Sequence, residues 1–482
     1  MGKTPPLIFY GVWILLKNLQ MLYFYCADKK ITKEVCQLND IIHILNLHPR
    51  DVKDCSFHFE NSMMFYSITL TQDEFVCKDC SSKLKIKDYR KRKISHQLIR
   101  GKDTYIIYNA RRYFCSTCHK THFESNPFSN NSHISTLTQI EILKSLKEVN
   151  HTFSSVSRTF HIPVTTIVSI FDKYAHMTTL DFPEIMCIDE HYAFRKKETQ
   201  YISLLVDFKN GTIIDVVNGR TKRHFSSYTQ LLSKKEVSKV KFISIDMSTT
   251  YKSVQQLYFP AATLCVDSFH VVATINKLLK RIRITIMNKY QRDSINYYLL
   301  KTFHWLLMTN GTNIDYNTPR YNRKLKGYYN YNRLLEMILD IDPILRTAYQ
   351  LKEDYIFFNS TASLDSAHDQ LLDIIIKFKN SNIPSFVSFA DSLSLWFVEI
   401  VNSFTIRNER RISNGIIESI NSKIDTLLTA ANGYSNFSRL RNRIMFSINK
   451  NSPLITYRTK PINIKEPGKI RGTYRKKNKV EI

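Results

Sequence analysis

The sequence predicts a multidomain protein of the α+β and α/β classes, in which two small domains precede a mixed sheet that is interrupted by an all-α insertion. Three observations carry this prediction. Two Cys-x-x-Cys pairs lie in the first quarter of the chain, period-two strand patterns fill residues 183–273, and residues 274–405 have a helical period. With 482 residues, of which 43% are hydrophobic, the chain is long enough for several buried cores, and a disordered chain is excluded.

Charge and cysteine content limit the kinds of partner and the cellular compartment that we expect for this chain. The chain has 69 Lys and Arg residues against 42 Asp and Glu residues, and the net charge of +27 is spread over several clusters. We therefore expect a polyanionic partner, double-stranded DNA rather than a membrane, and the alternative is a basic protein that its charge keeps soluble. Nine cysteines, an odd number with close pairs, favour metal binding in a reducing compartment, so we expect a cytoplasmic protein.

Residues 1–70 form an N-terminal segment of uncertain role. Its apolar run, Leu7 to Leu16, is too short to span a bilayer and lacks a small-residue cleavage site. Whether residues 1–20 belong to the native protein stays open. Residues 31–70 predict only a small α/β element.

Residues 71–128 predict a zinc ribbon, because two Cys-x-x-Cys pairs with a strand-like stretch between them can place four thiolates around one tetrahedral ion. One structural zinc would hold this small fold together and present the basic stretch 83–100 to DNA phosphates. The predicted zinc ligands are Cys77, Cys80, Cys115 and Cys118, and the predicted phosphate contacts are Lys91, Arg92 and Lys93.

Residues 129–180 predict a helix-turn-helix DNA-binding domain. The apolar spacing indicates three short amphipathic helices, and Pro163 opens the third helix after a tight turn. The residues that the third helix would offer to a major groove are Thr165, Thr166 and Ser169. A generic three-helix packing unit explains the same periodicity.

Residues 183–273 predict the first part of a mixed-sheet core, and residues 406–450 its last helices. Three strand signals, a helix, a fourth strand, a second helix and a fifth strand follow one another. This β-β-β-α-β-α-β order is that of the RNase H-like fold, and the step from order to fold is analogy.

Residues 274–405 predict the all-α insertion, and residues 451–482 a basic tail. The insertion begins with the basic stretch 275–292, and the residues of that stretch expected to contact DNA are Lys280, Arg281 and Arg283. Basic residues far outnumber the acids of the tail, so we expect the tail to be disordered without DNA.

Two predicted strands end on an aspartate in positions that suit metal-dependent phosphoryl transfer. Asp189 ends the first strand and Asp246 ends the fourth, and these strands are neighbours in the RNase H-like order. Two Mg²⁺ (or Mn²⁺) ions about 4 Å apart, held by a few carboxylates, would activate a water or a 3′-hydroxyl and stabilise the leaving oxygen. A helix packed across the strands would supply a third carboxylate. Periodicity alone gives no reason to choose Glu418, which lies off the apolar stripe of its helix with Asn421 one turn along.

The chain resembles the DDE transposases of bacterial insertion sequences, specifically the ISL-three group, over about residues 75–447. The resemblance rests on "CIDEHYAFRKKETQYISLLVDFKNGTIIDVV", "IDMSTTYKSVQQLYFPAATLCVDSFHVV" and "RRISNGIIESINSKIDTLLTAANGYSNFSRLRNR", in this order, together with the paired Cys-x-x-Cys ribbon and the helices after it. It implies an RNase H-like catalytic core that cuts element ends and joins their 3′-hydroxyls to target DNA with Mg²⁺. By motif, it implies that the first acid is Asp189 in "CIDE" and the last is Glu418 in "SNGIIES".

The middle acid is open between Asp246 and Asp267, because both lie in matching stretches. Strand order favours Asp246, since the second carboxylate of such a core ends the fourth strand. Asp267 ends the fifth strand and precedes His270 in "DSFH", which resembles a Cys-or-Asp, two residues, His signature that several transposase groups carry after the second acid. We expect Asp267 and His270, together with Asn421, to support the site.

Other charged residues near the first acid compete with this assignment. We expect Glu190 to face the other way along the strand and Asp207 to be a turn residue before Asn210. The cluster Arg195–Lys197 either contacts the scissile strand or lies on a solvated hairpin face.

The resemblance also implies a bacterial, nucleoid-associated location and a homodimer or larger assembly on paired element ends. Two other functions stay open. One is a DNA-binding regulator that derives from a transposase and has no catalysis, and the other is a structure-specific nuclease without strand transfer.

Overall fold

The computed structural model describes residues 45, 47–71, 76–99, 101–130, 132–194, 199–230 and 232–455. The apolar N-terminal run, the cluster Arg195–Lys197 and most of the basic tail therefore lie outside the described residues. The chain divides into two compact units, unit 1 (Met1–Leu146 and Phe153–Phe171) and unit 2 (Lys147–Thr152 and Asp172–Ile482). None of the helices described is both long and apolar enough to cross a membrane.

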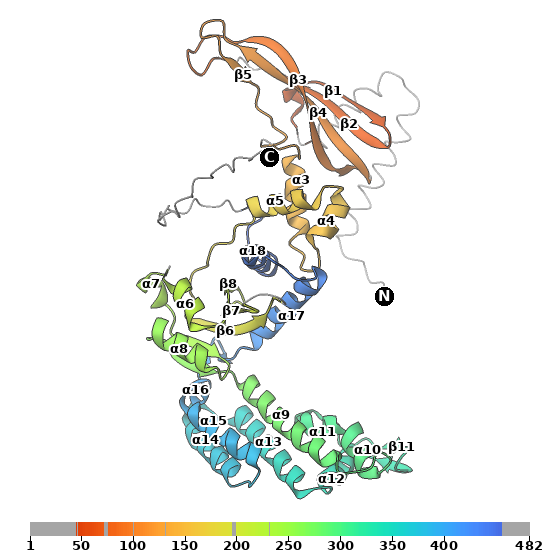
Figure 1. Ribbon diagram of the computed structural model, residues 1–482, viewed down its shortest axis with the longest axis vertical. Coiled ribbons are helices and arrows are strands. Elements are labelled where there is room, and N and C mark those ends of the chain that lie inside the picture. Colours follow the sequence, from red (N-terminus) through yellow and green to blue (C-terminus); the bar gives the residue numbers. More distant parts are fainter. Residues whose placement is uncertain are drawn as a thin grey trace, which may run out of the picture. The chain divides into compact units, whose positions relative to one another are not determined.

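Unit 1 is built on a five-stranded sheet (Figure 1). A 3₁₀ turn, Pro49–Asp51, precedes β1 (Val52–Glu60), β2 (Met63–Leu70), β3 (Lys85–Ile99), β4 (Lys102–Phe114) and β5 (Thr121–Phe123). The strand order is β1-β2-β4-β3, β5 pairs with β4, and only the β2–β4 pair is parallel. The sheet thus includes strands from both sides of the predicted boundary at residue 70. The strands β1 and β2 therefore belong with the ribbon strands rather than with a separate N-terminal segment.

Three helices follow the sheet, as the apolar spacing predicted: α3 (Thr136–Ser145), α4 (Phe153–Phe160) and α5 (Val164–Tyr174). Ser135 caps α3 by accepting a hydrogen bond from the amide of Thr138. The turn before α5 has His161 at φ 53°, and the carbonyl of Pro163 accepts the first helical bond of α5. The buried face of α5 carries Ile167, Ile170 and Phe171.

The sheet of unit 2 has five strands in the order β10-β9-β6-β7-β8. These are β6 (Ile185–Tyr192), β7 (Tyr201–Asp207), β8 (Ile213–Val217), β9 (Phe242–Ile245) and β10 (Thr263–Val266). The first three are antiparallel neighbours, whereas β9 runs parallel to β6 and β10 parallel to β9. The first and fourth strands of the predicted order are therefore direct neighbours.

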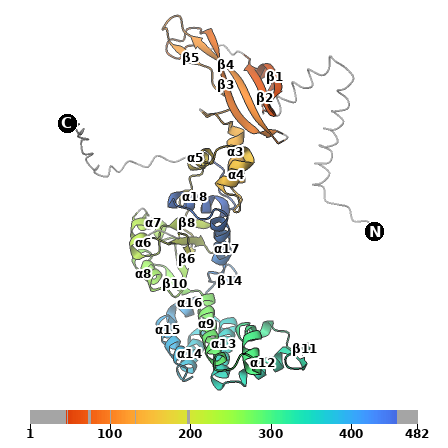
Figure 2. The ribbon, with the colours of Figure 1, turned by 45° about the vertical axis from the view of Figure 1, so that its right-hand side comes forward.

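Helices cover both faces of this sheet. On one side lie α6 (Lys222–Thr229), α7 (Lys234–Val237) and α8 (Thr249–Tyr258), and on the other lie α17 (Gly415–Ala430) and α18 (Phe437–Ile448) (Figures 1 and 2). The buried stripe of α17 is Ile417, Ile420, Ile424 and Leu427, as its periodicity predicted. A hairpin of two strands with two residues each, β13 (Ile406–Arg407) and β14 (Arg410–Arg411), leads into α17.

The insertion between β10 and β13 is mostly helical. Its helices are α9 (Ser268–Met287), α10 (Ile295–Thr302), α11 (His304–Met308), α12 (Tyr331–Leu339), α13 (Pro343–Thr361), α14 (Leu364–Lys379), α15 (Pro384–Leu395) and α16 (Phe397–Asn402), with a 3₁₀ turn at Gly311–Asn313. One hydrophobic core continues from the sheet into these helices, through residues such as Ile188, Leu279 and Phe389.

The prediction of an all-α insertion is wrong at one place. An antiparallel hairpin, β11 (Arg320–Asn322) and β12 (Gly327–Tyr329), interrupts the helices. Strands of three residues are too short to give a recognisable period of two, so the sequence pattern missed them.

Candidate active site and zinc site

The four predicted zinc ligands meet at one point in unit 1. The sulfur atoms lie within 4.8 Å of one another, with 3.4 Å between Cys77 and Cys118 and 3.4 Å between Cys80 and Cys115. Four cysteine sulfurs at this spacing fit a tetrahedral structural zinc. The four sulfur atoms therefore form the set of possible zinc ligands that the sequence predicted.

Two similar backbone turns position the sulfurs. The amide of Ser81 donates to the carbonyl of Cys77 at 2.8 Å, and the amide of His119 donates to the carbonyl of Cys115 at 3.0 Å. Ser81 and His119 both have positive φ, 55° and 59°. The amide of Cys118 lowers the pKa of the Cys115 thiol, which favours the thiolate that a zinc ion needs.

A histidine that the sequence pattern did not single out stands beside this site. His122, in β5, has its Nε2 atom 3.3 Å from the sulfur of Cys77. Its ring, the Asp79 carboxylate and the Cys77 sulfur also form a group of possible metal ligands. A His four residues after the second Cys-x-x-Cys pair is the signal that would have drawn attention to it.

Two carboxylates of unit 2 are brought together by the register of β6 and β9. In this parallel pair Cys187 lies opposite Ser244, and two residues further along are Asp189 and Asp246. Residues two apart point to the same face of a strand, and neighbouring strands lie about 4.8 Å apart. The first and the favoured middle acid thus stand side by side. The prediction that Asp189 ends its strand is wrong, because β6 continues to Tyr192, whereas Asp246 directly follows β9.

Asp246 has one carboxylate oxygen without a partner. Its Oδ1 atom is buried and accepts no hydrogen bond within the part of the chain that the structure describes. The pKa of Asp246 is raised to about 6, chiefly by burial; His270 lowers it, and the neighbouring carboxylates of Asp189 and Glu190 contribute to the rise. A buried carboxylate oxygen beside a second carboxylate is a donor set that suits a divalent cation.

Asp189 is held by two hydrogen bonds. Its Oδ1 accepts from the amide of Glu190 at 2.8 Å, and its Oδ2 accepts from the side-chain amide of Asn421 at 3.0 Å. Asn421 lies on α17, so this bond ties the helix to β6. The residue predicted to support the site therefore contacts the first acid.

Glu418 lies one turn before Asn421 on α17. Residues three apart share a side of a helix, so Glu418 is on the flank of α17 that contacts Asp189. Its side chain is exposed, and among the described residues no group of three carboxylates comes within metal-binding distance. The structure thus assembles two of the three predicted acids and places the third on the adjoining helix.

Asp267 has a structural position. It precedes α9 as the N-cap residue, is 2% exposed, and accepts a hydrogen bond from the amide of Asn414 at 3.2 Å. Burial raises the pKa of Asp267, while the Nε2 atom of His270 lies 3.8 Å from its Oδ2. This carboxylate joins the start of α9 to the start of α17.

Asn414 completes that junction and was missed as a bridging residue. Asn414 is the N-cap residue of α17, yet its side chain makes no cap bond. Its amide nitrogen Nδ2 instead donates to the carbonyl of Ile188 at 3.2 Å. Asn414 thereby connects β6, directly before Asp189, with Asp267, a link between segments distant in sequence that no local pattern reveals.

Two competing acids have other partners. Glu190 pairs with Arg220 at 2.6 Å, and Asp207 accepts hydrogen bonds from the amide of Lys209 and the side chain of Asn210. Neither is therefore needed to explain the carboxylate pair.

The residues predicted to contact DNA differ in accessibility. Lys91, Lys93, Thr165, Ser169, Lys280 and Arg281 are exposed, and Arg92 and Thr166 are half-buried. Arg283 is buried and donates to the carbonyl of Leu300 at 2.8 Å. Because that guanidinium is used inside the insertion, we do not include Arg283 in a DNA-binding surface.

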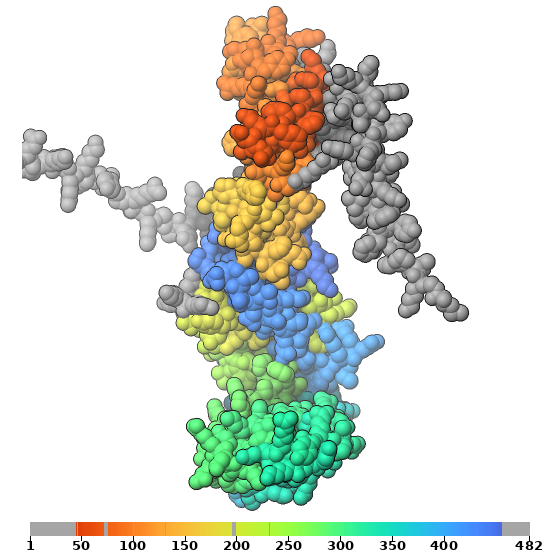
Figure 3. Space-filling model, turned by 90° about the vertical axis from the view of Figure 1, so that its right-hand side faces the viewer, coloured from red at the N-terminus to blue at the C-terminus, as the bar shows by residue number. Residues whose placement is uncertain are grey.

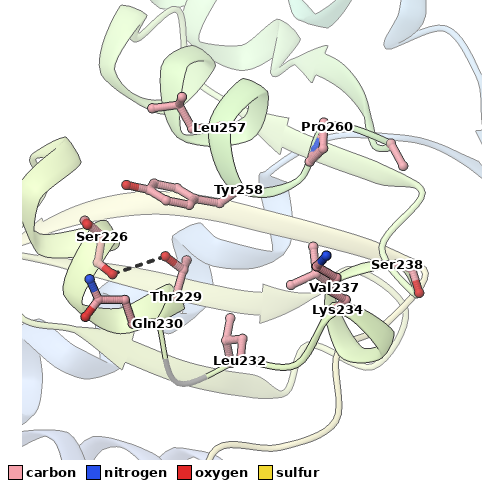
Figure 4. A pocket seen from close by; sticks show the side chains of 11 residues that line it. Ser226, Thr229, Gln230, Leu232, Lys234, Val237, Ser238, Leu257, Tyr258 and Pro260 are labelled. Carbon is pink, nitrogen blue, oxygen red and sulfur yellow. Dashed lines mark hydrogen bonds between the residues drawn. The ribbon is translucent and has the colours of Figure 1, made fainter.

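A cavity of about 530 Å³ lies between α6, α7 and the end of α8 (Figure 4). Leu232, Val237, Leu257 and Tyr258 contribute much of its lining, and no described residue of the lining is an acid. The cavity is therefore separate from the carboxylate pair and offers no metal ligand of that kind.

Comparison with known proteins identifies the class of protein. The family model described as "Transposase", of the ISL3 group of DDE transposases, matches residues 186–444, more than half of the chain. A second model, described as the zinc finger of transposase IS204/IS1001/IS1096/IS1165, matches residues 73–118, which include all four clustered cysteines. The chain belongs to the ISL3 family of DDE transposases.

Curated relatives agree with this placement. The chain is 24% identical over 255 residues to the transposase for insertion sequence element IS1001 of Bordetella parapertussis, covering 52% of this chain and 57% of that protein. It is 26% identical over 278 residues to the transposase for insertion sequence element IS1557 of Mycobacterium tuberculosis, covering 55% and 58%. The chain thus spans less than two thirds of the relatives that it matches.

Proposed function

We propose that the chain is a DNA transposase that binds the terminal repeats of an insertion sequence, cleaves phosphodiester bonds at its ends and joins the 3′-hydroxyl ends to target DNA. The observation that carries this proposal is the register of β6 and β9, which sets Asp189 beside Asp246. Family membership and the relatives' names support it.

We further propose that the unit 2 sheet has the RNase H-like arrangement. Its support is the order β10-β9-β6-β7-β8, with three antiparallel strands followed by two that run parallel to β6. In this arrangement the first and fourth strands are neighbours, which places Asp189 of β6 beside Asp246, the residue after β9.

Asp189, Asp246 and Glu418 would hold two Mg²⁺ (or Mn²⁺) ions. Such ions, when bound, lower the pKa of an attacking water and stabilise the departing 3′-oxygen. Asn421 orients Asp189 through its hydrogen bond, and burial leaves one Asp246 oxygen without a competing donor. Glu418, being exposed, is accessible to complete the set.

Asp246 is our choice of middle acid over Asp267. Asp267 already accepts a hydrogen bond from the amide of Asn414, so its carboxylate is used to join the start of α9 to the start of α17. The free oxygen of Asp246 and its position opposite Asp189 favour a ligand role. Asp267 and His270 then support the site from the neighbouring strand.

DNA recognition is assigned to unit 1. The zinc ribbon would present Lys91, Arg92 and Lys93 of β3 to phosphates, and α4 and α5 would act as a helix-turn-helix with Thr165 and Ser169 exposed. A dimer or larger assembly would bring two element ends together.

The test compares cleavage of labelled element ends with Mg²⁺ by the wild type and by four single alanine variants. Asp189→Ala, Asp246→Ala and Glu418→Ala should each lower cleavage at least about 1,000-fold, the scale of a lost electrostatic catalytic group, while end binding persists. Asp181→Asn, which changes an exposed acid of the same unit, is the control and should cleave normally. Cleavage that survives Asp246→Ala but is lost in Asp267→Ala would reverse the choice of middle acid.

One observation favours the alternative of a DNA-binding regulator. Glu418 is separate from the other two carboxylates, as it would be in a core that no longer assembles. A wild-type protein that binds element ends but cleaves neither with Mg²⁺ nor with Mn²⁺ would support this alternative and contradict the proposal.

A further inference from the structure

The hairpin of the insertion has an unusual composition. Residues 316–335 contain five Lys or Arg residues and five Tyr residues, and no Asp or Glu. The family motifs quoted above do not include this segment, and the proposed chemistry does not use it. Such interleaving of basic and aromatic residues is typical of surfaces that bind nucleic acids.

The hairpin is anchored at its base. Arg320, in β11, donates to the hydroxyl of Tyr331, and its guanidinium lies 4.8 Å from the centre of that ring. Tyr331 in turn packs edge-to-face on Trp305 of α11, with ring centres 4.9 Å apart. The strands therefore project from a packed aromatic base rather than from a loop.

The turn is also ordered. The Asn322 side chain accepts hydrogen bonds from the amides of Lys324 and Leu325, both at 3.0 Å, and from the hydroxyl of Tyr298 at 3.3 Å. Because Tyr298 belongs to α10, the turn is held to the helical body. Figure 1 shows β11 at the edge of the insertion beside α10 and α12, and this edge faces the viewer in Figure 3.

Two tyrosine rings stand out from this base. Tyr321 and Tyr328 are directly paired across the hairpin and are 57% and 75% exposed. Their ring centres are 5.3 Å apart at an angle of 61°. Aromatic rings that are exposed together on a rigid element are available to stack on a partner.

The turn supplies cations without acidic partners. Arg323, Lys324 and Lys326 are exposed and make no ion pair with any residue that the structure describes. Elsewhere in the insertion Lys377 and Lys379 pair with the carboxylates of Asp354 and Asp391. The cations of the hairpin are thus left for an external anion.

We propose that the hairpin Arg320–Tyr329 is a DNA-contact element, in which Arg323, Lys324 and Lys326 neutralise phosphates while Tyr321 and Tyr328 stack on bases that are unpaired or unstacked. Stacking needs the face of a base, which regular duplex DNA does not expose at its surface. A second copy of this chain is a poor partner, because two such basic hairpins would repel each other.

The experiment uses the full chain without added Mg²⁺, so that no cleavage occurs. Fluorescence anisotropy measures binding to a labelled duplex about 30 base pairs long and to the same duplex with a central unpaired bubble of about six nucleotides. Tyr321→Ala/Tyr328→Ala should weaken binding to the bubble about 10- to 100-fold and change duplex binding little. Tyr321→Phe/Tyr328→Phe, which keeps both rings, should bind as the wild type does.

Charge is tested separately through the salt dependence. Arg323→Gln/Lys324→Gln should reduce the slope of log Kd against log salt by about 2, one for each phosphate contact. The matched controls are Lys377→Gln/Lys379→Gln, which removes two ion-paired cations of the same insertion, and Phe357→Ala, which removes a 68% exposed ring of α13. Both controls should behave as the wild type.

Several outcomes would overturn the proposal. One is that the hairpin variants bind both DNA probes as the controls do. Another is that a tyrosine variant changes the oligomeric state in light scattering while DNA binding stays unchanged. If the alanine variant unfolds, the phenylalanine and glutamine variants decide. Because the readout is binding, a chain that fails to cleave DNA would contradict the proposed function and leave this inference intact.

Discussion

The two predicted metal sites differ in how far the chain assembles them. In unit 1 four cysteine sulfurs already lie within 4.8 Å of one another, whereas in unit 2 two carboxylates are paired and Glu418 stays exposed on α17. One zinc ion can hold four cysteine thiolates together, whereas three carboxylates repel one another unless cations lie between them. The difference is that unit 1 brings all four proposed zinc ligands to one point, while the proposed third acid of unit 2 lies on a separate helix.

The largest expected effect comes from removing a zinc ligand. Cys77→Ser should release the zinc and unfold the ribbon of unit 1, since structural zinc contributes about 10 kcal/mol or more to such small folds. Zinc content, limited proteolysis and binding of element ends measure this. We expect loss of zinc and of binding, with unit 2 still resistant to protease.

The control is Cys55→Ser, a buried cysteine of the same unit that lies outside the cluster, which should keep one zinc. Because His122 lies 3.3 Å from the Cys77 sulfur, zinc retained by Cys77→Ser must then be lost in Cys77→Ser/His122→Ala. Zinc retained by the double variant would contradict the four-cysteine site.

A smaller effect is expected at Asp267, which distinguishes a carboxylate that holds the fold from one that binds metal. Asp267→Ala leaves the buried amide of Asn414 without an acceptor, so we expect a loss of about 2 kcal/mol in the free energy of unfolding of unit 2. Chemical denaturation measures this, without and with Mg²⁺.

The loss at Asp267 should be the same under both conditions, because no metal contact is removed. A loss that appears only with Mg²⁺ would make Asp267 a ligand and would change the assignment of the middle acid.

The sequence could predict what depends on local pattern. The Cys-x-x-Cys spacing identified the four cysteines that the structure brings together. The period of two located β6 and β9, so the position of Asp189 beside Asp246 followed from strand order. The 3.6-residue period likewise identified the buried stripe of α17.

Contacts between distant segments could not be predicted in this way. Asn414 joins Ile188 to Asp267 across more than 140 residues of sequence, and its cap-like position concealed that role. Arg283 looked like part of a basic surface, but its place on the buried side of α9 depends on how α10 packs against it. Only resemblance, not periodicity, selected Glu418.

We predict that the buried Asp246 carboxylate, which suits a proposed metal ligand, lowers the stability of the folded state. Burial raises the pKa of Asp246 to about 6, above the ordinary value of 3.8, so the folded state holds its proton more tightly than the unfolded state does. Stability therefore falls as the pH rises from about 4 through 6, and the penalty is complete above that range.

Asp246→Asn removes this penalty without changing the shape of the side chain. We expect the variant to be more stable than the wild type by about 1–2 kcal/mol at pH 8 without metal, and equally stable near pH 4. Thermal unfolding across this range measures the difference. Mg²⁺ should stabilise only the wild type, and a variant less stable than the wild type at pH 8 would show that the Asp246 carboxylate is not strained by burial.

The smallest effect is expected at Asn421, whose amide donates to Asp189. Asn421→Ala removes one hydrogen bond to a charged group, worth about 1–2 kcal/mol, so cleavage should fall about 10-fold and the metal concentration for half-maximal activity should rise. Asn421→Asp places a like charge beside Asp189, so cleavage at low Mg²⁺ should be weaker than in Asn421→Ala but should recover as Mg²⁺ is raised. Ser422→Ala, an exposed neighbour on α17, should behave as the wild type. If Asn421→Ala instead cleaved normally at low Mg²⁺, the carboxylate pair would be positioned by the strands alone, and α17 would serve only to bring Glu418.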